Sequence, residues 1–317
     1  MTHARLLPLT ALLLLAACSG DPDAVPIPDP DKLPDTSEAA STGNSGPLTT
    51  ETVQAPDEVL QAVVVGEWRS ESDRARDTWR HPAESLTFWG LRPGMTILEI
   101  QPGGGWWTEI LAPYAQRTEG QYYATAVDLE DPEIGDKARQ SRERWAARWA
   151  EKPELYGEVK LVNWGPKSAA LPEETFDFVL TARSIHGWIT RGEADKLFAD
   201  LYAAIKPGGI LGVEQHRAAP GEQELPPKSG YVTEAYVIDL ANKAGFELDD
   251  SSDINANPAD TKDHPFGVWT LPPASRTRPY SEGADARDPD FDRAKYDAIG
   301  ESDRMTLRFH KPIAAAG

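Results

Sequence analysis

The stretch Ile97–Ala112, ILEIQPGGGWWTEILA, joins two apolar runs through three glycines. The first run, residues 97–100, has the composition of a short buried strand, and the second, residues 107–112, has apolar residues at helical spacing. The glycines at 103–105 separate the two runs and let the backbone approach a ligand that a Cβ atom would block. The N–H groups at the start of the following helix are donors for such a ligand. The stretch therefore predicts the first half of a nucleotide-binding βα unit.

The residues around the glycines distinguish between two kinds of nucleotide-binding motif. A dinucleotide fingerprint, G-x-G-x-x-G, requires a third glycine where this chain has Thr108. The stretch instead resembles motif I of class I S-adenosylmethionine-dependent methyltransferases, an acidic residue followed by x-G-x-G-x-G. Those places are taken here by Glu99, Gln101, Gly103 and Gly105, with Gln101 where a glycine is usual. A glycine turn that closes a βα unit without binding a ligand is the alternative.

Residues 1–18 have the pattern of a targeting segment rather than of a folded element. A short basic start precedes an apolar run, residues 6–17, that is too short to span a bilayer as a helix. The run ends in Leu-Ala-Ala-Cys18, which resembles a bacterial lipobox and implies cleavage before Cys18 and acylation of its thiol. Ser19 favours the outer membrane over the inner membrane. We therefore expect a periplasm-facing lipoprotein of the cell envelope, with an ordinary secretory signal as the alternative.

Composition limits the classes of partner and site. Cys18 is the only cysteine, so no disulfide and no thiolate metal site is expected in the domain. A net charge of −19 argues against a nucleic-acid surface, because phosphate binding needs clustered Lys and Arg. Residues 19–55 consist mostly of Pro, Asp, Ser, Thr and Gly and predict a disordered tether. The folded domain is expected over residues 56–317, and no protein partner is indicated.

Polar residues follow the second and third predicted strands. Residues 120–127 predict the second strand, and Asp128 follows it about 20 residues past the glycines, where a carboxylate accepts from both ribose hydroxyls of a nucleotide. A helix N-cap is the alternative for this acid. Residues 158–163 predict the third strand, and the family resemblance implies that Asn163 or Trp164 contacts the adenine ring. An ordinary turn is the alternative there.

Arg183 and His186 follow the fourth predicted strand, residues 176–180. In a doubly wound sheet the carboxyl end of this strand borders the ligand crevice. We predict His186 as a general base, because imidazole takes up a proton near neutral pH, with a hydrogen-bonded structural histidine as the alternative. Arg183 is predicted to hold an anionic group of the substrate or to pair with a nearby acid.

Turn signals and periodicity predict the rest of the domain. Residues 194–205 predict an amphipathic helix that ends in the turn Lys206–Gly209, before a fifth strand at residues 210–213. A further helix is expected over residues 230–245. The alternating residues 304–311 predict the last strand, which the methyltransferase resemblance makes antiparallel.

The polar segment 253–271 is expected to be an irregular loop over the site. It contains three residues of metal-ligand type, Asp260, Asp263 and His264. No second cluster with ligand spacing accompanies them, so no metal site is predicted.

The ordered set of motifs implies an α/β fold. We expect a Rossmann-like doubly wound sheet of seven strands, with an antiparallel last strand and helices on both faces. The chain also resembles an uncharacterised bacterial group of predicted methyltransferases. That resemblance is carried by E-I-x-P-G-G-G-W at residues 99–106, N-x-N-P-x-D at residues 255–260 and V-W-T-L-P-P at residues 268–273.

The resemblance implies S-adenosylmethionine-dependent methyl transfer to a small-molecule acceptor. Glu99 would orient the amino acid end of the cofactor, Gly103 and Gly105 would shape the loop, and Asp128 would hold the ribose. A non-catalytic binding module anchored to the envelope is the alternative, because a supply of S-adenosylmethionine is not expected outside the inner membrane. A nicotinamide oxidoreductase is the weakest alternative, because Thr108 replaces the third glycine.

Overall fold

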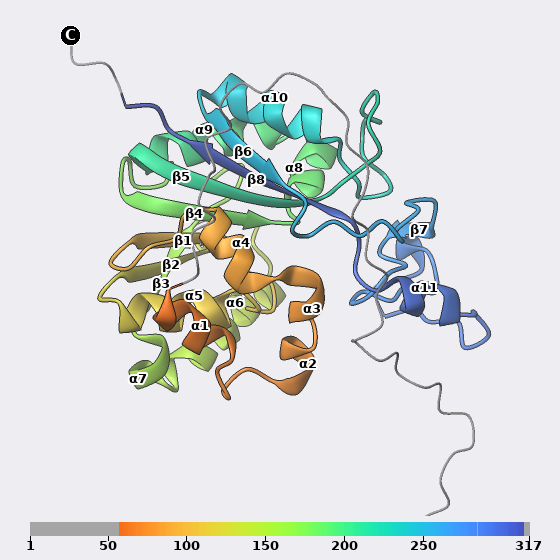
Figure 1. Ribbon diagram of the computed structural model, residues 1–317, viewed down its shortest axis with the longest axis horizontal. Coiled ribbons are helices and arrows are strands. Elements are labelled where there is room, and N and C mark those ends of the chain that lie inside the picture. Colours follow the sequence, from red (N-terminus) through yellow and green to blue (C-terminus); the bar gives the residue numbers. More distant parts are fainter. Residues whose placement is uncertain (1–56, 284, 314–317) are drawn as a thin grey trace, which may run out of the picture. The chain divides into compact units, whose positions relative to one another are not determined.

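The computed structural model describes residues 57–283 and 285–313, so the predicted signal peptide and tether, with Cys18, lie outside the described residues. Within the described part, seven strands form one sheet: β1 (Thr96–Ile100), β2 (Gln121–Ala126), β3 (Val159–Asn163), β4 (Phe176–Ala182), β5 (Ile205–His216), β6 (Glu247–Ser252) and β8 (Arg304–His310). Their order across the sheet is β3-β2-β1-β4-β5-β8-β6 (Figure 1).

Strand direction confirms the predicted Rossmann-like doubly wound sheet with an antiparallel last strand. The pairs among β1 to β5 are parallel, whereas β8 runs antiparallel to both β5 and β6. In the register of the sheet, Glu99 of β1 lies between Ala124 of β2 and Leu180 of β4. The chain runs outward from β1 to β3 and then returns to β4 beside β1. A crevice therefore forms at the carboxyl ends of β1 and β4, where the strand order reverses.

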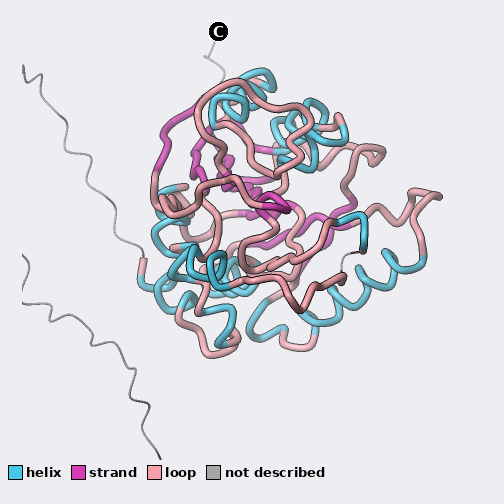
Figure 2. Tube along the Cα trace, turned by 90° about the vertical axis from the view of Figure 1, so that its right-hand side faces the viewer, coloured by secondary structure: helices cyan, strands magenta, loops and turns pink. Residues whose placement is uncertain are grey.

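Helices cover both faces of the sheet. In chain order they are α1 (Glu58–Val64), α2 (Glu71–Arg74), α3 (Asp77–Arg80), α4 (Pro82–Phe88), α5 (Thr108–Arg117), α6 (Asp136–Ala150), α7 (Pro153–Tyr156), α8 (Ile185–Arg191), α9 (Ala194–Ala204), α10 (Glu234–Ala244) and α11 (Ala294–Ile299). The view in Figure 2 shows helices above and below the central strands. Among the described residues, no helix has both the length and the apolar character that a membrane span requires.

Strand β1 is buried on both faces, and alternation divides its side chains between two hydrophobic cores. Leu98 and Ile100 pack in the core beneath α8, α9 and α10, while Ile97 packs in the core beneath α4, α5 and α6. Glu99 follows the same alternation as Ile97. Its carboxyl group is therefore buried on the α5 side of the sheet, where Thr108 donates a hydrogen bond to it.

Two segments differ from the sequence-based expectation. Residues Lys206–Gly209, predicted as a turn before β5, belong to β5 itself. The N–H of Gly208 donates to the carbonyl of Lys311, and the N–H of Lys311 donates to the carbonyl of Gly209, so this part of the chain stays paired with the end of β8. Segment 253–271 contains the short strand β7 (Pro265–Val268), and five of its polar residues are buried: Asn255, Asn257, Asp260, His264 and Thr270.

A buried cluster of charges ties the first helices to the last strand. The carboxylate of Glu301 accepts hydrogen bonds from Nε of Arg76 and of Arg80, both at 2.8 Å, and from Nη1 of Arg304 at 3.0 Å. Nη1 of Arg304 also donates to Glu214 of β5 at 2.6 Å. Burial by itself would raise the pKa of Glu301. The nearby arginines, Arg80 foremost, lower it by more than burial raises it, so the pKa is about 2. The cluster is stable only while its opposite charges stay paired.

Removal of one carboxylate charge from this cluster tests how much the cluster contributes to the stability of the fold. We expect Glu301→Gln to lower the free energy of unfolding at pH 7 by about 3–5 kcal/mol, because buried guanidiniums lose their counter-ion. The loss relative to the wild type should shrink as the pH falls from about 4.5 to about 2, where Glu301 itself becomes protonated in the folded state. Urea unfolding at a series of pH values measures both effects.

Glu282→Gln is the matched control for this variant. The carboxylate of Glu282 pairs with Arg278 at 3.1 Å, but both side chains are nearly half exposed. An exposed ion pair contributes about 0–1 kcal/mol, so this substitution should change stability little. If E301Q costs no more than E282Q, the buried cluster does not hold the fold together as described.

Candidate functional site

The loop after β1 adopts backbone angles that favour glycine. Gly103 and Gly105 have φ values of 56° and 86°, and Gln101 has a φ of 50°. A side chain in this left-handed region costs roughly 1–2 kcal/mol. Gln101 is held there by two hydrogen bonds: its N–H donates to the Thr125 hydroxyl at 2.7 Å, and its Oε1 accepts from the Trp188 ring at 3.0 Å. The departure from the usual glycine therefore leaves the shape of the loop intact.

The three glycines of the loop serve different purposes. A Cβ atom on Gly105 would lie 2.3 Å from the ring of Trp149, so packing in the core requires a glycine there. A Cβ atom on Gly103 would come no closer than 4.0 Å to another residue, and one on Gly104 would meet nothing within 4 Å. Gly103 and Gly104 therefore present bare backbone to open space beside the loop.

Two cavities of the described structure flank this loop and share Gln101, Pro102 and Gly103. The larger, about 430 Å³ and here called the α6 cavity, lies between the ends of β2 and β3 and helix α6. It is lined by Gln101, Pro102, Gly103, Thr125, Ala126, Val127, Ala138, Ser141, Arg142, Trp145 and Trp164. The smaller, about 180 Å³ and here called the arginine cavity, is lined by Asp73, Arg76, Arg80, Glu99, Ile100, Gln101, Pro102, Gly103, Gly104, Trp106, Trp107, Ala182 and Arg183.

Asp128 lies at the edge of the α6 cavity. It follows Val127, which lines that cavity, and its Oδ1 accepts from the N–H of Glu130 at 2.9 Å. Helix α6 begins only at Asp136, so the alternative of a helix N-cap does not hold for Asp128. Burial lowers the pKa of Arg142, and the charge of Asp128 acts against that shift. Asp128 and Arg142, which lines this cavity, are thus close enough for their charges to interact.

The predicted adenine contacts occupy different positions. Trp164 is buried, lines the α6 cavity and donates from its ring to Asp200 at 3.2 Å. The side chain of Asn163 instead accepts a hydrogen bond from Arg142. Sequence reasoning missed Arg142, although the helical spacing of Ala138, Arg142 and Trp145 places these residues on one face of α6.

Glu99 lies in the floor of the arginine cavity and is 3% exposed. Its Oε2 accepts from the hydroxyl groups of Thr108 at 2.9 Å and Tyr122 at 2.5 Å. Burial raises the pKa of Glu99 to about 7, although these hydrogen bonds oppose the shift. Near pH 7 the carboxyl group therefore changes charge readily, and a cationic ligand group would favour its ionised form. Thr108, which replaces the third glycine of a dinucleotide site, is thus a partner of the acid.

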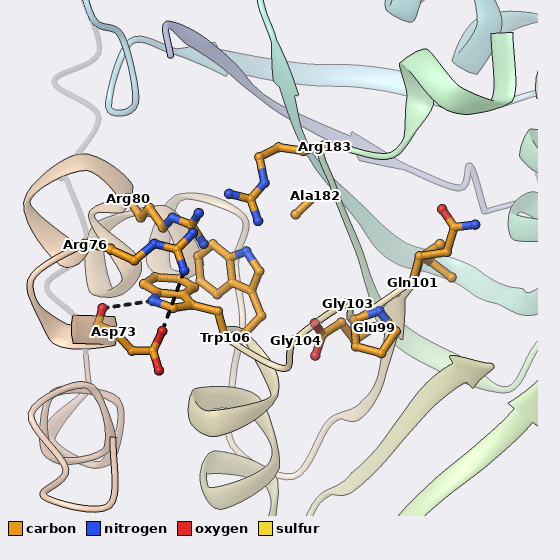
Figure 3. Close-up of a pocket in the computed structure, with 13 residues that line it drawn as sticks. Asp73, Arg76, Arg80, Glu99, Gln101, Gly103, Gly104, Trp106, Ala182 and Arg183 are labelled. Atoms are coloured by element: carbon orange, nitrogen blue, oxygen red, sulfur yellow. Dashed lines mark hydrogen bonds and ion pairs between the residues drawn. The ribbon is translucent and has the colours of Figure 1, made fainter. Parts of the chain in front are cut away.

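Three arginines converge on the arginine cavity. Figure 3 shows the guanidinium groups of Arg76, Arg80 and Arg183 directed toward one another beside the ring of Trp106. Arg183 has a φ of 58° directly after β4, and its Nη1 lies 3.8 Å from Glu301. Burial lowers the pKa of Arg183, and burial together with Arg183 lowers that of Arg80. The sequence predicted Arg183 for this place; it gave no local signal for Arg76 or Arg80.

His186 lies on α8 and lines neither of these two cavities. Its Nδ1 is 3.2 Å from the side-chain nitrogen of Gln215, and its ring packs against those of His216 and Trp269. Burial lowers the pKa of His186 to about 4, so the ring is neutral at pH 7 but is a weak base. The role of His186 as a general base stays a prediction.

The expected loop 253–271 contributes no residue to the lining of either cavity. Asp260 accepts from the hydroxyl of Tyr231 at 2.9 Å and lies 2.7 Å from Nε2 of His264, while the N–H of Asp303 donates to it at 2.8 Å. These contacts bury the segment against the chain before β8, which is why it does not form a polar cover. Among the described residues, no group of three or more His, Cys, Asp or Glu side chains is arranged to hold a metal ion.

Comparisons with known proteins agree with this arrangement. Residues 98–213, from β1 into β5, match the family model of a methyltransferase domain. No curated protein matches the chain. One similar solved structure is a SAM-dependent methyltransferase from Aquifex aeolicus, with 20% identity, a TM-score of 0.43 and coverage of 57% of this chain and 87% of that chain.

Two further solved structures are similar at the same level. The cyclase SpnF has 20% identity, a TM-score of 0.45 and coverage of 79% of this chain and 84% of that one. A SAM-dependent methyltransferase from Methanosarcina mazei has 14% identity, a TM-score of 0.41 and coverage of 70% and 95%. Likeness at this level carries no functional argument, so the fold assignment rests on the strand order. The domain match over residues 98–213 supports methyl transfer as the general activity, with S-adenosylmethionine as the implied methyl donor.

Proposed function

We propose that this protein transfers the methyl group of S-adenosylmethionine to a small-molecule acceptor. The observation that carries the proposal is the junction of two cavities at Gln101–Gly103, where the strand order reverses. Glu99 lies on one side of this junction and Asp128 lies next to the other side. S-Adenosylmethionine is a nucleoside with a charged amino acid tail. Its nucleoside end suits the lining of the α6 cavity, and its charged tail suits that of the arginine cavity.

The residues present fit such a cofactor. The α6 cavity offers the rings of Trp145 and Trp164 to a flat base, and Asp128 is an acceptor for ribose hydroxyls. Gly103 and Gly104 allow close approach of the loop backbone. When bound, S-adenosylmethionine would supply a sulfonium methyl group, whose carbon a nucleophilic atom attacks in line while the bond to the thioether sulfur breaks. The chain's own task is to align the two reactants.

Asp128→Ala tests the nucleoside end of the site. S-Adenosylhomocysteine at about 100 times its Kd should stabilise the wild-type chain by about 2.7 kcal/mol. We expect D128A to weaken its binding by about tenfold or more, because charge-assisted hydrogen bonds to the ribose are lost. Calorimetric titration and thermal unfolding, with S-adenosylmethionine as the second ligand, measure this change.

Asp131→Ala is the matched control, because Asp131 accepts from the N–H of Glu133 as Asp128 accepts from that of Glu130. Asp128 follows a residue that lines the α6 cavity, whereas neither chain neighbour of Asp131 lines it. The control variant should bind S-adenosylhomocysteine as the wild type does. If the wild type binds neither ligand up to millimolar concentrations, the methyl-transfer proposal fails, and a non-catalytic binding module becomes the better account.

The pKa of Glu99 predicts how cofactor binding depends on pH. The ionised carboxylate attracts the ammonium group of the ligand, whereas the protonated form does not. Affinity for S-adenosylhomocysteine should therefore fall as the pH is lowered through about 7, with Kd rising by up to about tenfold per pH unit. Glu99→Gln should bind more weakly at pH 8 and lose this dependence. Titration between pH 5.5 and pH 8.5 measures both.

Two controls accompany the pH series. 5′-Methylthioadenosine, which lacks the amino acid end, should bind with little pH dependence over the same range. Glu109→Gln removes another carboxyl group whose pKa burial raises, but Glu109 pairs with Arg148 and lines neither cavity. This variant should keep the wild-type profile. Equal pH profiles for the wild type and E99Q would show that Glu99 does not meet the ligand.

The proposal also places the domain at the periplasmic face of the cell envelope, held by a lipid on Cys18. The support is the lipobox-like sequence before Cys18. Expressed in a bacterial host with the lipoprotein pathway, the wild-type chain should enter the outer-membrane fraction, and Cys18→Ser should leave it. Ser19→Asp is the matched variant and should move the protein toward the inner membrane. Membrane fractionation measures the location of the protein, and mass spectrometry of the mature amino terminus measures the acylation of Cys18. An unacylated Cys18 contradicts the lipid anchor.

A further inference from the structure

Arg80 is a buried arginine that is only partly satisfied. Its side chain is fully buried, and its Nε donates to Glu301 at 2.8 Å. Within the described residues, neither Nη1 nor Nη2 of Arg80 has a hydrogen-bond partner. The guanidinium group lies over the ring of Trp106, with Cζ 4.6 Å from the ring centroid. Buried donors are nearly always paired in folded proteins, so these two nitrogens indicate a missing partner.

The unpaired nitrogens belong to a residue that lines the arginine cavity. Arg76 and Arg183 line the same cavity, and their guanidinium groups approach that of Arg80 from the other sides (Figure 3). Arg76 lies directly before α3, Arg80 lies in α3, and Arg183 follows β4. Planar guanidinium groups bind carboxylate and phosphate groups through paired N–H donors. The chemistry of the cavity therefore favours an oxyanion.

The charge balance around this cavity, which has four arginines and four carboxyl groups, favours an anion once the cofactor is bound. The charged side chains that line it, or that pair with those lining it in the cluster around Glu301, are Arg76, Arg80, Arg183, Arg304, Asp73, Glu99, Glu214 and Glu301. Glu99, with a pKa of about 7, is the acid that the ammonium group of the cofactor would engage. The sulfonium group then adds a positive charge beside the arginines. With its carboxylate counted, the bound cofactor has one net positive charge, which a neutral acceptor would leave uncompensated.

The carboxylate of the cofactor does not account for all of these donors. One carboxylate offers about four acceptor positions, whereas each of the three guanidinium groups presents several N–H donors. The backbone N–H groups of Gly103 and Gly104, which have no hydrogen-bond partner among the described residues, are also available to the cofactor's carboxylate. Arg80, whose two terminal nitrogens have no partner among the described residues, is left for a second anion.

We propose that Arg80, together with Arg183 and Arg76, binds an anionic group of the methyl acceptor, a carboxylate or a phosphate, in the arginine cavity. This inference rests on the methyl-transfer function proposed above. Beside the amino acid end of the cofactor, a cavity of about 180 Å³ admits one further small group and not a polymer. The acceptor is thus a small acid whose anionic group fixes the position of its nucleophilic atom.

The test uses the full-length chain and inorganic phosphate as the probe, titrated by calorimetry at constant ionic strength with and without S-adenosylhomocysteine. The central variant is Arg80→Met. Arg69→Met is the matched control, because Arg69 is equally buried and lies over the same ring of Trp106. Arg69, however, is paired with Asp77 through both terminal nitrogens and does not line the cavity.

Three results support the proposal. Phosphate binds the wild type saturably, and bound S-adenosylhomocysteine does not displace it. R80M weakens phosphate binding by about tenfold or more, whereas R69M changes it less than about twofold. R80M leaves the affinity for S-adenosylhomocysteine within about twofold of the wild-type value.

Two results overturn it. In the first, phosphate competes with S-adenosylhomocysteine, and R80M weakens the binding of S-adenosylhomocysteine but not that of 5′-methylthioadenosine. Arg80 would then hold the carboxylate of the cofactor. In the second, phosphate binding is not saturable, or R80M and R69M weaken it equally.

Failure of the proposed function is seen separately, because it appears as absence of S-adenosylhomocysteine binding. Saturable phosphate binding that depends on Arg80 would then still support an anion site. Should R80M fail to fold by circular dichroism, Arg183→Met and Arg76→Met replace it. Those side chains are 24% and 25% exposed, so their removal disturbs the core less. Each should weaken phosphate binding, and unchanged binding in both contradicts the proposal.

Discussion

The carboxylate of Glu301 joins parts of the chain that are more than 200 residues apart in sequence. It pairs with Arg76 and Arg80 before the sheet begins and with Arg304 at the start of its last strand. Charges are buried at tolerable cost only when they are paired, so these segments must meet for the domain to fold. The same contacts hold α3 beside the carboxyl ends of β1 and β4. The arginine cavity is therefore a consequence of how the fold is closed.

The three glycines of the loop after β1 are needed for different reasons, one for packing and two for access of a ligand. Gly105 is required by the ring of Trp149, whereas Gly103 and Gly104 leave open space beside two cavities. Gln101 keeps a glycine-like φ because Trp188 and Thr125 hold it by hydrogen bonds. The loop thus tolerates a side chain at its first position and stays bare where a ligand would approach.

The two cavities differ in chemistry, and this difference organises the proposed function. The α6 cavity has two indole rings and one arginine in its lining, which suits a flat base and a sugar. The arginine cavity combines guanidinium groups with a buried acid whose pKa is about 7, which suits charged groups of both signs. A nucleoside cofactor and an acidic acceptor would meet at the junction between them. Such an arrangement places the reacting atoms next to the switch point of the sheet.

Local signals in the sequence determined the strands β1 to β4, residues 210–213 of β5, the glycine loop, the acid Asp128 after β2 and the alternating last strand. Apolar periodicity and glycine angles act over a few residues, which is why they are visible in the sequence. Tertiary structure alone decided the rest of the site. Arg80 and Arg142 reach the cavities from helices whose patterns predict only exposed charge. Asn255 and Asp260 of the polar segment 253–271 are buried because their hydrogen-bond partners, Thr306 and the N–H of Asp303, lie far along the chain. Pairing between residues far apart in the chain produces no periodic pattern in the sequence. Only the folded structure therefore shows which charged residues pair.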